Sequence, residues 1–317
     1  MQTSSYLLDL TVRLMQGVAR LPAGLRERQA GYLLGCQNSD GGFRGRACDS
    51  DLYYTGFALR ALATLDALTP TICSQTADYL RHHLIGQAAI IDFFSLLYAS
   101  FLVGMGGEDV LAGSPADWPD RVAAALEDFR TPDGGYAKSS GGASGSVYHT
   151  FLVALSYQLL DRAIPQPENV LRFVYSRQRA DGGFVEIAPM RRSGTNPTAA
   201  AIGVLQVLHS PDTPALTLAI HESTRDFLVQ MQTGEGGLRG NSRSPVADLL
   251  STFTGLWTLI QLGGFDRIDR AAMQRFVLGL EQPEGGFRAG LWDEQTDVEY
   301  TFYGLGCLAL LSSEKGV

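Results

Sequence analysis

The sequence is organised around a short phrase that occurs five times. Each copy contains an acidic residue, then two glycines, then an aromatic residue or leucine; the acidic residues are Asp40, Asp133, Asp181, Glu235 and Glu284. Successive copies are separated by 93, 48, 54 and 49 residues, and a constant spacing of roughly 50 residues is typical of repeat proteins. The first gap is twice the others, which predicts a degenerate sixth copy near residues 85–88.

Every repeat shows the same order of helical patterns. A stretch with helical apolar spacing, such as 273–280, leads into the phrase, and the glycines are expected to end that helix because glycine adopts positive φ without steric cost. The acidic side chain is expected to fix the turn by bonding to nearby backbone groups, and the aromatic residue to plug the contact with the next helix. A second helix then begins at Ser or Thr, as in 55–62 and 301–308, and its nearly uniform apolar surface is typical of a buried helix.

Six hairpins of this kind predict an all-α fold. Each hairpin supplies one outer helix and one apolar inner helix, so the six can close into a double-walled ring, an α/α toroid, around a central cavity. We expect residues 25–317 to form this single domain. Residues 1–24 are expected to form an amphipathic helix that packs on the ring and covers a gap in its outer wall.

Composition narrows the functional classes. The formal net charge is −8 and no block of basic residues is present, which disfavours nucleic acid as a partner. No apolar run reaches the ~20 residues of a membrane-spanning helix, and the first ten residues lack the basic start of a signal peptide. The cysteines, Cys36, Cys48, Cys73 and Cys307, have neither metal-ligand nor redox spacing. These features predict a cytoplasmic protein with free thiols.

The most informative positions lie at the start of the second helices. Aligning these helices on their first Ser or Thr places five threonines in one column: Thr55, Thr150, Thr198, Thr252 and Thr301. The residues just before this column should point toward one end of the cavity, and the carboxylates found there are Asp51, Asp248, Asp297 and Glu299. One interpretation makes them catalytic. The other makes the three aspartates helix caps, because helix N-termini stabilise nearby anions.

Aromatic and basic residues accompany these carboxylates. The candidate substrate-binding residues are Tyr53, Tyr54, Tyr148, Trp292, Tyr300, Arg239 and Arg243. Aromatic faces stabilise cations, and the two arginines follow the phrase of the fifth repeat, where they can attract an anionic group. The alternative is that the aromatic residues fill the ring and that the arginines are ordinary surface residues. His149 is either a base or a structural histidine.

The Gln-x-x-Asp-Gly-Gly-Phe phrase, at this period and in about six copies, resembles the repeats of two related families. One is the β subunit of protein prenyltransferases, and the other comprises squalene-hopene and class II terpene cyclases. The resemblance extends over roughly residues 28–312. It implies the toroid fold and a cavity that binds an isoprenoid or prenyl diphosphate, where aromatic rings would stabilise carbocations.

For the prenyltransferase β subunit, the resemblance implies a zinc site made of an Asp, a Cys two residues later and a His from the last repeat. Asp248 matches the Asp, but Leu250 stands at the Cys position and Tyr300 at the His position. Leucine cannot ligate a metal, and Zn²⁺ takes about four nitrogen, sulfur or oxygen ligands. No zinc is therefore expected.

For the class II cyclases, the resemblance implies the motif Asp-x-Asp-Asp-Thr, whose middle Asp protonates an alkene or epoxide. Residues 297–301 read Asp-Val-Glu-Tyr-Thr, which places Asp297 first, Glu299 in the middle and Tyr300 at the last Asp. A carboxyl in an apolar, aromatic cavity has a raised pKa and can act as a general acid. Alternatively, Asp248, Asp297 and Glu299 bind Mg²⁺ and so hold a diphosphate for ionisation.

The sequence thus predicts an isoprenoid-processing enzyme, similar to terpene cyclases, that protonates or ionises a prenyl or terpenoid substrate. Glu299 and Asp297 are expected to form the acid or metal-binding pair, assisted by Asp248 and Asp51. Two alternatives stay open. One is a zinc-free relative of the prenyltransferase β subunit that transfers a prenyl group together with a partner subunit. The other is a non-catalytic isoprenoid-binding protein.

Overall fold

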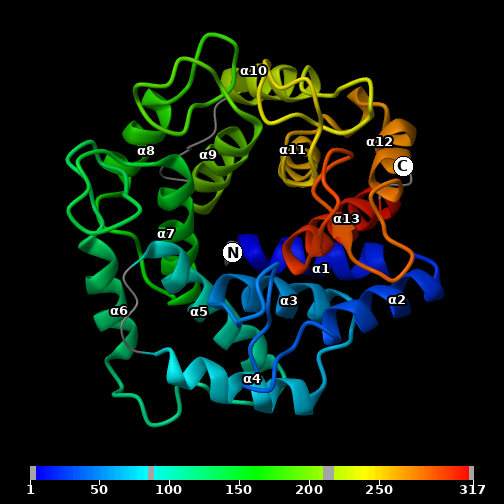
Figure 1. The fold of residues 1–317 in the computed structure, drawn as a ribbon. Coiled ribbons are helices and arrows are strands. Elements are labelled where there is room, and N and C mark those ends of the chain that lie inside the picture. Colours follow the sequence, from blue (N-terminus) through cyan, green and yellow to red (C-terminus); the bar gives the residue numbers. More distant parts are fainter. Residues whose placement is uncertain (1–4, 85–88, 210–217, 314–317) are drawn as a thin grey trace. The chain divides into compact units, whose positions relative to one another are not determined.

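The protein is mostly helical, as the sequence predicts. The computed structural model describes residues 5–84, 89–209 and 218–313, and within them it contains thirteen α-helices, one 3₁₀ helix and two short strands (Figure 1). In chain order these are α1 (Tyr6–Val18), α2 (Ala23–Leu34), α3 (Leu52–Thr64), α4 (Pro70–His82), α5 (Ile90–Met105), α6 (Trp118–Glu127), α7 (Val147–Leu159), α8 (Pro167–Ser176), α9 (Thr195–Val207), α10 (Leu218–Val229), α11 (Leu249–Gln261), η1 (Phe265–Arg267), α12 (Arg270–Leu278), β1 (Phe287–Arg288), β2 (Thr296–Asp297) and α13 (Val298–Ser313). Across these described ranges, no helix has both the length and the apolar character that a membrane span requires.

From α2 onward the described helices form six consecutive pairs, which confirms the predicted six hairpins. The second helix of each pair is the more buried one. In α9, for example, Ala201, Ile202, Val204 and Leu205 have no exposed surface. The degenerate copy of the phrase that was expected near residues 85–88 lies outside the described residues.

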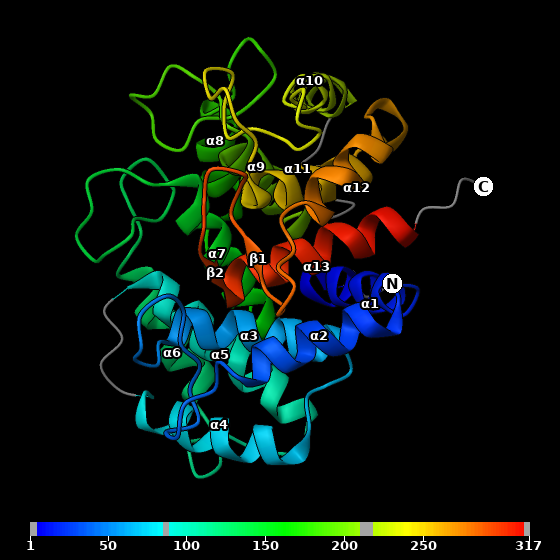
Figure 2. The ribbon, with the colours of Figure 1, turned by 45° about the vertical axis from the view of Figure 1, so that its right-hand side comes forward.

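The chain divides into two compact units. The first consists of Met1–Tyr6, Ala88–Phe94 and Pro115–Arg270, and the second of Leu7–Gln87, Ser95–Ser114 and Ala271–Val317. In the first unit α9 packs against both α7 and α11, and in the second unit α13 packs against α3, as can be followed in Figures 1 and 2. The expectation of one domain over residues 25–317 stays a prediction.

The first glycine of each phrase has the backbone conformation that the sequence predicts. These residues are Gly41, Gly134, Gly182, Gly236 and Gly285, with φ between 88° and 102°. At Gly182 there is a second reason for glycine, because a Cβ there would lie 2.2 Å from the carbonyl oxygen of Ser223 on α10. The phrase therefore ends one helix and lets the next repeat approach closely.

The five threonines that align in the sequence all accept a hydrogen bond through their hydroxyl oxygen. In every copy the residue after the two glycines donates its backbone N–H to the column threonine at 2.8 to 3.2 Å. The pairs are Phe43 with Thr55, Tyr136 with Thr150, Phe184 with Thr198, Leu238 with Thr252 and Phe287 with Thr301. All five donor residues have no exposed surface, which confirms that they act as plugs.

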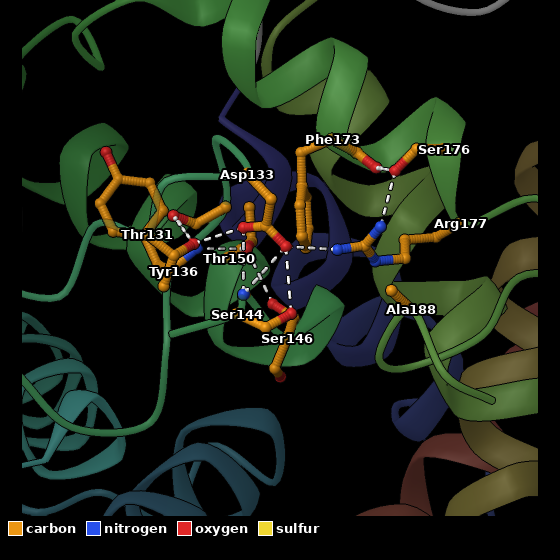
Figure 3. A network of polar contacts seen from close by, with 12 residues as sticks. Thr131, Asp133, Tyr136, Ser144, Ser146, Thr150, Phe173, Ser176, Arg177 and Ala188 are labelled. Atoms are coloured by element: carbon orange, nitrogen blue, oxygen red, sulfur yellow. Dashed lines mark hydrogen bonds and ion pairs between the residues drawn. The ribbon is translucent and has the colours of Figure 1, made fainter. Parts of the chain in front are cut away.

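In four of the five copies, those of Asp40, Asp133, Asp181 and Glu235, the acidic residue of the phrase bonds to a residue near the end of the loop that precedes the second helix. Asp40 and Asp181 each accept a hydrogen bond at 2.7 Å from a serine near the end of that loop. Figure 3 shows the corresponding network around Asp133, which accepts from Thr131 Oγ1 at 2.6 Å and the Gly145 amide at 3.1 Å and forms an ion pair of 2.5 Å with Arg177. Hydrogen bonds of the acidic residue thus join the start of this loop to its end, just before the second helix begins.

Replacing Thr198 by Val is expected to lower the free energy of unfolding by about 1–3 kcal/mol, because the buried Phe184 amide would lose its acceptor. Neither residue has exposed surface, so bulk water cannot take the place of the hydroxyl. Urea denaturation measures the change. Thr198→Ser keeps Oγ and serves as the control. A Val variant as stable as the wild type would contradict a structural role for this bond.

The N-terminal helix α1 contacts second helices of the second unit, and its expected cover over a gap in an outer wall stays a prediction. Within the second unit, Gly17 lies against the Ala309 backbone of α13, and Thr11 Oγ1 is 3.1 Å from the hydroxyl of Tyr98 on α5. Glycine at position 17 has no Cβ, which permits this close backbone contact.

Candidate active site

The candidate site in the second unit is built where α13 begins beside α3. Strand β2 pairs with β1 in antiparallel register, Phe287 opposite Asp297, and leads directly into α13. Glu299 therefore lies in the first turn of α13. The hydroxyl of Tyr53, in the first turn of α3, donates a hydrogen bond of 2.6 Å to Glu299 Oε1. The structure thus joins two residues that the sequence selected from the first and last repeats.

Glu299 is a partly buried carboxyl group with a raised pKa. The side chain is half-buried. Burial raises the pKa of Glu299 above its ordinary value, and the negative charge of Asp297 raises it further, against the opposing hydrogen bonds from Tyr53 and Tyr303. A carboxyl with a raised pKa keeps its proton at higher pH than usual and can give it to a substrate.

The neighbouring carboxylates are held by one arginine, Arg46. Its Nε donates to Asp297 Oδ2 at 2.7 Å and its Nη2 to Asp293 Oδ2 at 2.6 Å. The second oxygen of Asp297 accepts the backbone N–H of Tyr300 at 2.9 Å, so Asp297 also caps α13. Burial opposes the charge on Arg46, but these hydrogen bonds outweigh it and raise the pKa of the guanidinium. Both oxygens of Asp297 therefore accept hydrogen bonds.

Arg46 was not among the candidate site residues selected from the sequence. It lies 251 positions from Asp297 in the chain, in the loop between the first phrase and α3. The signal in the sequence that could have pointed to Arg46 is its position in the loop directly before α3, the helix that contains the aligned Thr55. Nothing in the pattern distinguishes it from Arg44, whose Nη2 donates to the Gly35 carbonyl at 2.7 Å.

Six aromatic rings extend from Glu299 along α3 and α13. This aromatic cluster consists of Tyr53, Tyr54, Phe57, Tyr300, Phe302 and Tyr303, with neighbouring ring centroids 4.9 to 6.1 Å apart. Phe57, Phe302 and Tyr303 are buried and were not selected from the sequence. Edge-to-face and tilted contacts of this kind present electron-rich faces, which attract cations.

A second arginine lies within this aromatic surround. The guanidinium carbon of Arg60 is 4.2 Å from the ring centroid of Phe57, 5.1 Å from that of Tyr98 and 5.7 Å from that of Phe302. Its Nε donates to the Gly56 carbonyl at 3.1 Å. The rings of Phe57, Tyr98 and Phe302 thus surround a cationic side chain, and the role of the selected aromatic residues in binding a substrate stays a prediction.

The other two selected carboxylates are helix caps. Asp51 is exposed and accepts the backbone N–H groups of Tyr53 and Tyr54 at 2.8 and 3.2 Å. Asp248 belongs to the first unit, where it accepts from the backbone and hydroxyl of Ser251 at 2.7 and 2.9 Å, and burial raises its pKa. The capping interpretation is confirmed for both residues, and their catalytic roles stay predictions.

The remaining selected residues are divided between the two units. Trp292 is 59% exposed in the turn between β1 and β2. In the first unit, Tyr148 is exposed on α7, Arg243 is exposed, and Arg239 donates from Nη2 to the Gln230 carbonyl at 3.2 Å. Their roles in substrate binding stay predictions.

The residues present do not fit the zinc site of the prenyltransferase β subunit. Leu250 is a half-buried hydrocarbon side chain on α11, and Tyr300 belongs to the aromatic cluster. Within residues 5–84, 89–209 and 218–313, no three His, Cys, Asp or Glu side chains are grouped to hold a metal ion. Magnesium binding by Asp248, Asp297 and Glu299 stays a prediction.

The chain matches one family model over most of its length. Residues 6–86, 87–237 and 200–317 match the family model for the prenyltransferase alpha-alpha toroid domain. The geranylgeranyl transferase type-1 subunit beta of Arabidopsis thaliana is 24% identical over 167 residues, which cover 51% of this chain and 44% of that protein. The chain thus spans less than half of the length of this curated relative.

Solved structures agree on the fold. The protein geranylgeranyltransferase-I of Candida albicans, complexed with GGPP, has a TM-score of 0.72 at 14% identity, with 92% of each chain covered. The type II terpene cyclase MstE from Scytonema has a TM-score of 0.61 at 15% identity, covering 94% of this chain and 98% of that one. These likenesses concern the fold, and with the family match they confirm the predicted α/α toroid class. The chain belongs to the prenyltransferase alpha-alpha toroid domain family.

Proposed function

We propose that this protein is an isoprenoid-processing enzyme in which Glu299 protonates a double bond or epoxide of a prenyl or terpenoid substrate. The observation that carries the proposal is the contrast between two adjacent carboxyl groups. Glu299 is hydrogen-bonded by Tyr53 and has a raised pKa, while Asp297 is ion-paired with Arg46 at 2.7 Å. Two carboxyls in unlike environments support separate roles as proton donor and fixed negative charge.

The chemistry assigned to Glu299 is a single proton transfer. Its O–H bond breaks, the π electrons of the substrate form a new C–H bond, and the adjacent carbon becomes cationic. The aromatic cluster offers ring faces that stabilise such a cation. Tyr53 donates to Glu299 Oε1, and the transferred proton comes from the protonated form of this carboxyl. The carboxylate formed by the transfer keeps the Tyr53 hydrogen bond, which stabilises its charge.

Prenyl transfer is the second candidate, and the comparisons favour it. The solved structure of a protein geranylgeranyltransferase-I has a TM-score of 0.72, and a transferase β subunit is the curated relative. Such an activity would require ionisation of a prenyl diphosphate, a role for Mg²⁺ in place of zinc, and a partner subunit. Leu250 at the family's cysteine position argues against zinc-activated transfer to a thiol.

A substrate screen separates these functions. The purified protein is incubated with geranyl, farnesyl and geranylgeranyl diphosphates and with squalene, each with and without Mg²⁺, and products are identified by mass spectrometry alongside a pyrophosphate assay. We expect a rearranged product that keeps its diphosphate, or a cyclised hydrocarbon. Pyrophosphate release that requires Mg²⁺ would instead support ionisation and transfer. Binding without any turnover would contradict both activities and support a non-catalytic isoprenoid-binding protein.

A further inference from the structure

Arg60 lies where α3 packs against α13, on the same face of α3 as Tyr53 and Phe57, which precede it by seven and three positions. Phe57 is buried, whereas Tyr53 and Arg60 are only half-buried. On α13, Glu299 is half-buried as well, and Phe302, three positions after it, has its ring centroid 5.7 Å from the guanidinium carbon of Arg60. The proposed proton donor and a positively charged side chain therefore share one partly exposed region of the second unit.

A buried hydroxyl group lies beside Arg60. Ser95, on α5 in the same unit, has no exposed surface, and its Oγ forms no hydrogen bond within the described residues. The position that a Cβ would take at Gly56 is 3.5 Å from Arg60 Nη2 and 3.8 Å from Ser95 Cβ, so both side chains border the same point of α3. A buried hydroxyl without a hydrogen bond costs free energy. The guanidinium and the hydroxyl can both donate to an oxygen acceptor, which an anionic group of a ligand provides.

The charge of Arg60 opposes the proposed reaction unless an anion neutralises it. Burial raises the pKa of Glu299, and Arg60 acts in the opposite direction, because its positive charge favours the ionised carboxylate. The same charge repels a carbocation held against the rings of Phe57 and Phe302, whose centroids are 4.2 and 5.7 Å from the guanidinium carbon. An anion paired with Arg60 would remove both effects.

Packing accounts for only part of this arrangement. An arginine stacked on aromatic rings is stabilised by its charge and by the apolar part of its side chain, and three rings surround Arg60 in this way. A methionine would fill the same space against the rings without bringing a positive charge into the region where a cation is formed. Packing therefore explains neither the charge at position 60 nor the unsatisfied hydroxyl of Ser95 beside it.

We propose that Arg60 and Ser95 form a subsite for an anionic oxygen group of the substrate, a diphosphate or a carboxylate, and that Arg60 thereby determines which isoprenoids the enzyme accepts. This inference rests on the proposed function, because the hydrocarbon chain of the substrate then lies along the rings of α3 and α13 toward Glu299. The anion pairs with the guanidinium through charge-assisted hydrogen bonds, and the pair has no net positive charge to oppose a carbocation. A substrate of this kind keeps its anionic group through the reaction, and a hydrocarbon such as squalene is a poor substrate.

Binding measurements test the subsite without any turnover. Isothermal titration calorimetry compares three probes with the same hydrocarbon chain, farnesyl diphosphate, farnesoic acid and farnesol, and we expect the wild type to bind one of the two anions more tightly than the alcohol. Arg60→Met, which keeps an apolar side chain against the rings, should weaken binding of that anion by about 10- to 100-fold and leave farnesol unchanged. Arg20→Met, at an exposed position in the same unit, is the matched control and should alter none of the three affinities. The proposal is overturned if the wild type has no preference for an anion, or if Arg60→Met leaves the anion affinity unchanged or weakens all three probes equally.

Ser95→Ala is the second variant, and it leaves the charge of Arg60 in place. Removal of a buried hydroxyl that has no hydrogen bond should keep the free energy of unfolding the same or raise it in urea denaturation, while the affinity for the anion should fall by about 2- to 10-fold. Wild-type affinity in this variant would overturn the part assigned to Ser95. The substrate screen separates this inference from the proposed function. Anion binding through Arg60 without turnover would support the subsite and refute the proton transfer, whereas turnover of squalene as fast as of any diphosphate would refute the subsite and leave Glu299 as the acid.

Discussion

Glu299→Gln is expected to lower the turnover number by about 10²- to 10⁴-fold, which is the usual contribution of a general acid. Glutamine has nearly the same shape and can keep a hydrogen bond with the Tyr53 hydroxyl, which donates to Glu299 at 2.6 Å, but it has no acidic proton. The Michaelis constant should change little, because the substitution removes an interaction made in the transition state. Steady-state kinetics on the substrate found in the screen measure both constants.

Two controls separate lost chemistry from lost structure. Glu294→Gln changes an exposed carboxyl in the same hairpin and should leave turnover unchanged. Because the folded pKa of Glu299 is raised, its contribution to stability is greatest at low pH and is lost as pH rises through that pKa. The Gln variant should therefore be at least as stable as the wild type at neutral pH. Wild-type turnover in Glu299→Gln would refute the assignment.

The rate should also depend on pH in a defined direction. The reaction needs the protonated form of Glu299, so the rate is expected to be highest at low pH and to fall as pH rises through the raised pKa of this carboxyl. A pH–rate profile over the range in which the fold is stable measures this. A rate that increases with pH across the same range would indicate that an ionised Glu299 is the active form, as metal binding would require.

Arg46→Met is expected to lower the free energy of unfolding by about 2–3 kcal/mol at neutral pH, because it leaves two carboxylates without their cation. The side chain of Asp297 is 1% exposed and that of Asp293 is 9% exposed, whereas Arg46 is 34% exposed, which places the effect below that of a fully buried pair. Arg46→Lys should recover only part of the loss, since one ammonium group cannot reproduce the fork that bonds both partners.

Denaturant titrations at two pH values test the origin of this loss. Burial alone would raise the pKa of Asp293, but the hydrogen bonds from Arg46 outweigh it and hold that pKa below its ordinary value. A lowered folded pKa gives stability that is present above the unfolded pKa, about 3.9 for Asp, and is lost as pH falls through the folded pKa. The difference between wild type and variant should therefore shrink below about pH 4. Arg121→Met, in an exposed pair with Asp117, is the control and should cost under about 1 kcal/mol. An equal loss from both variants would contradict the special role of Arg46.

Local signals in the sequence were sufficient to predict the helical hairpins and the turns between them. The first glycine of each phrase has positive φ, as predicted, and aligning Thr55 with Thr301 located a hydrogen bond that all five copies of the phrase make. These features depend on residues at most 14 positions apart, so one repeat contains all the information. The site combines distant parts of the chain. Arg46 meets Asp297 across 251 positions, and no local pattern predicts such a pair.

Other residues of the site lie on helices that are apolar on every face, so the sequence pattern did not distinguish them from core residues. In α13 almost every residue of 301–310 is buried, so helical periodicity does not show which face is turned toward α3. Tyr300 could be selected by its place beside Glu299, whereas Phe302 and Tyr303 could not.

The loops between the phrase and the second helix, held by hydrogen bonds at both ends, suggest how proteins with this fold can acquire different sites. In the first repeat the plug and its threonine are 12 positions apart, whereas the other four repeats use 14. The first loop is therefore two residues shorter, yet it keeps both hydrogen bonds and also presents Arg46 to the site. The residues between these two hydrogen-bonded ends can therefore change while the fold is kept. Each such loop is a position where a new catalytic or binding side chain can arise independently of the other repeats.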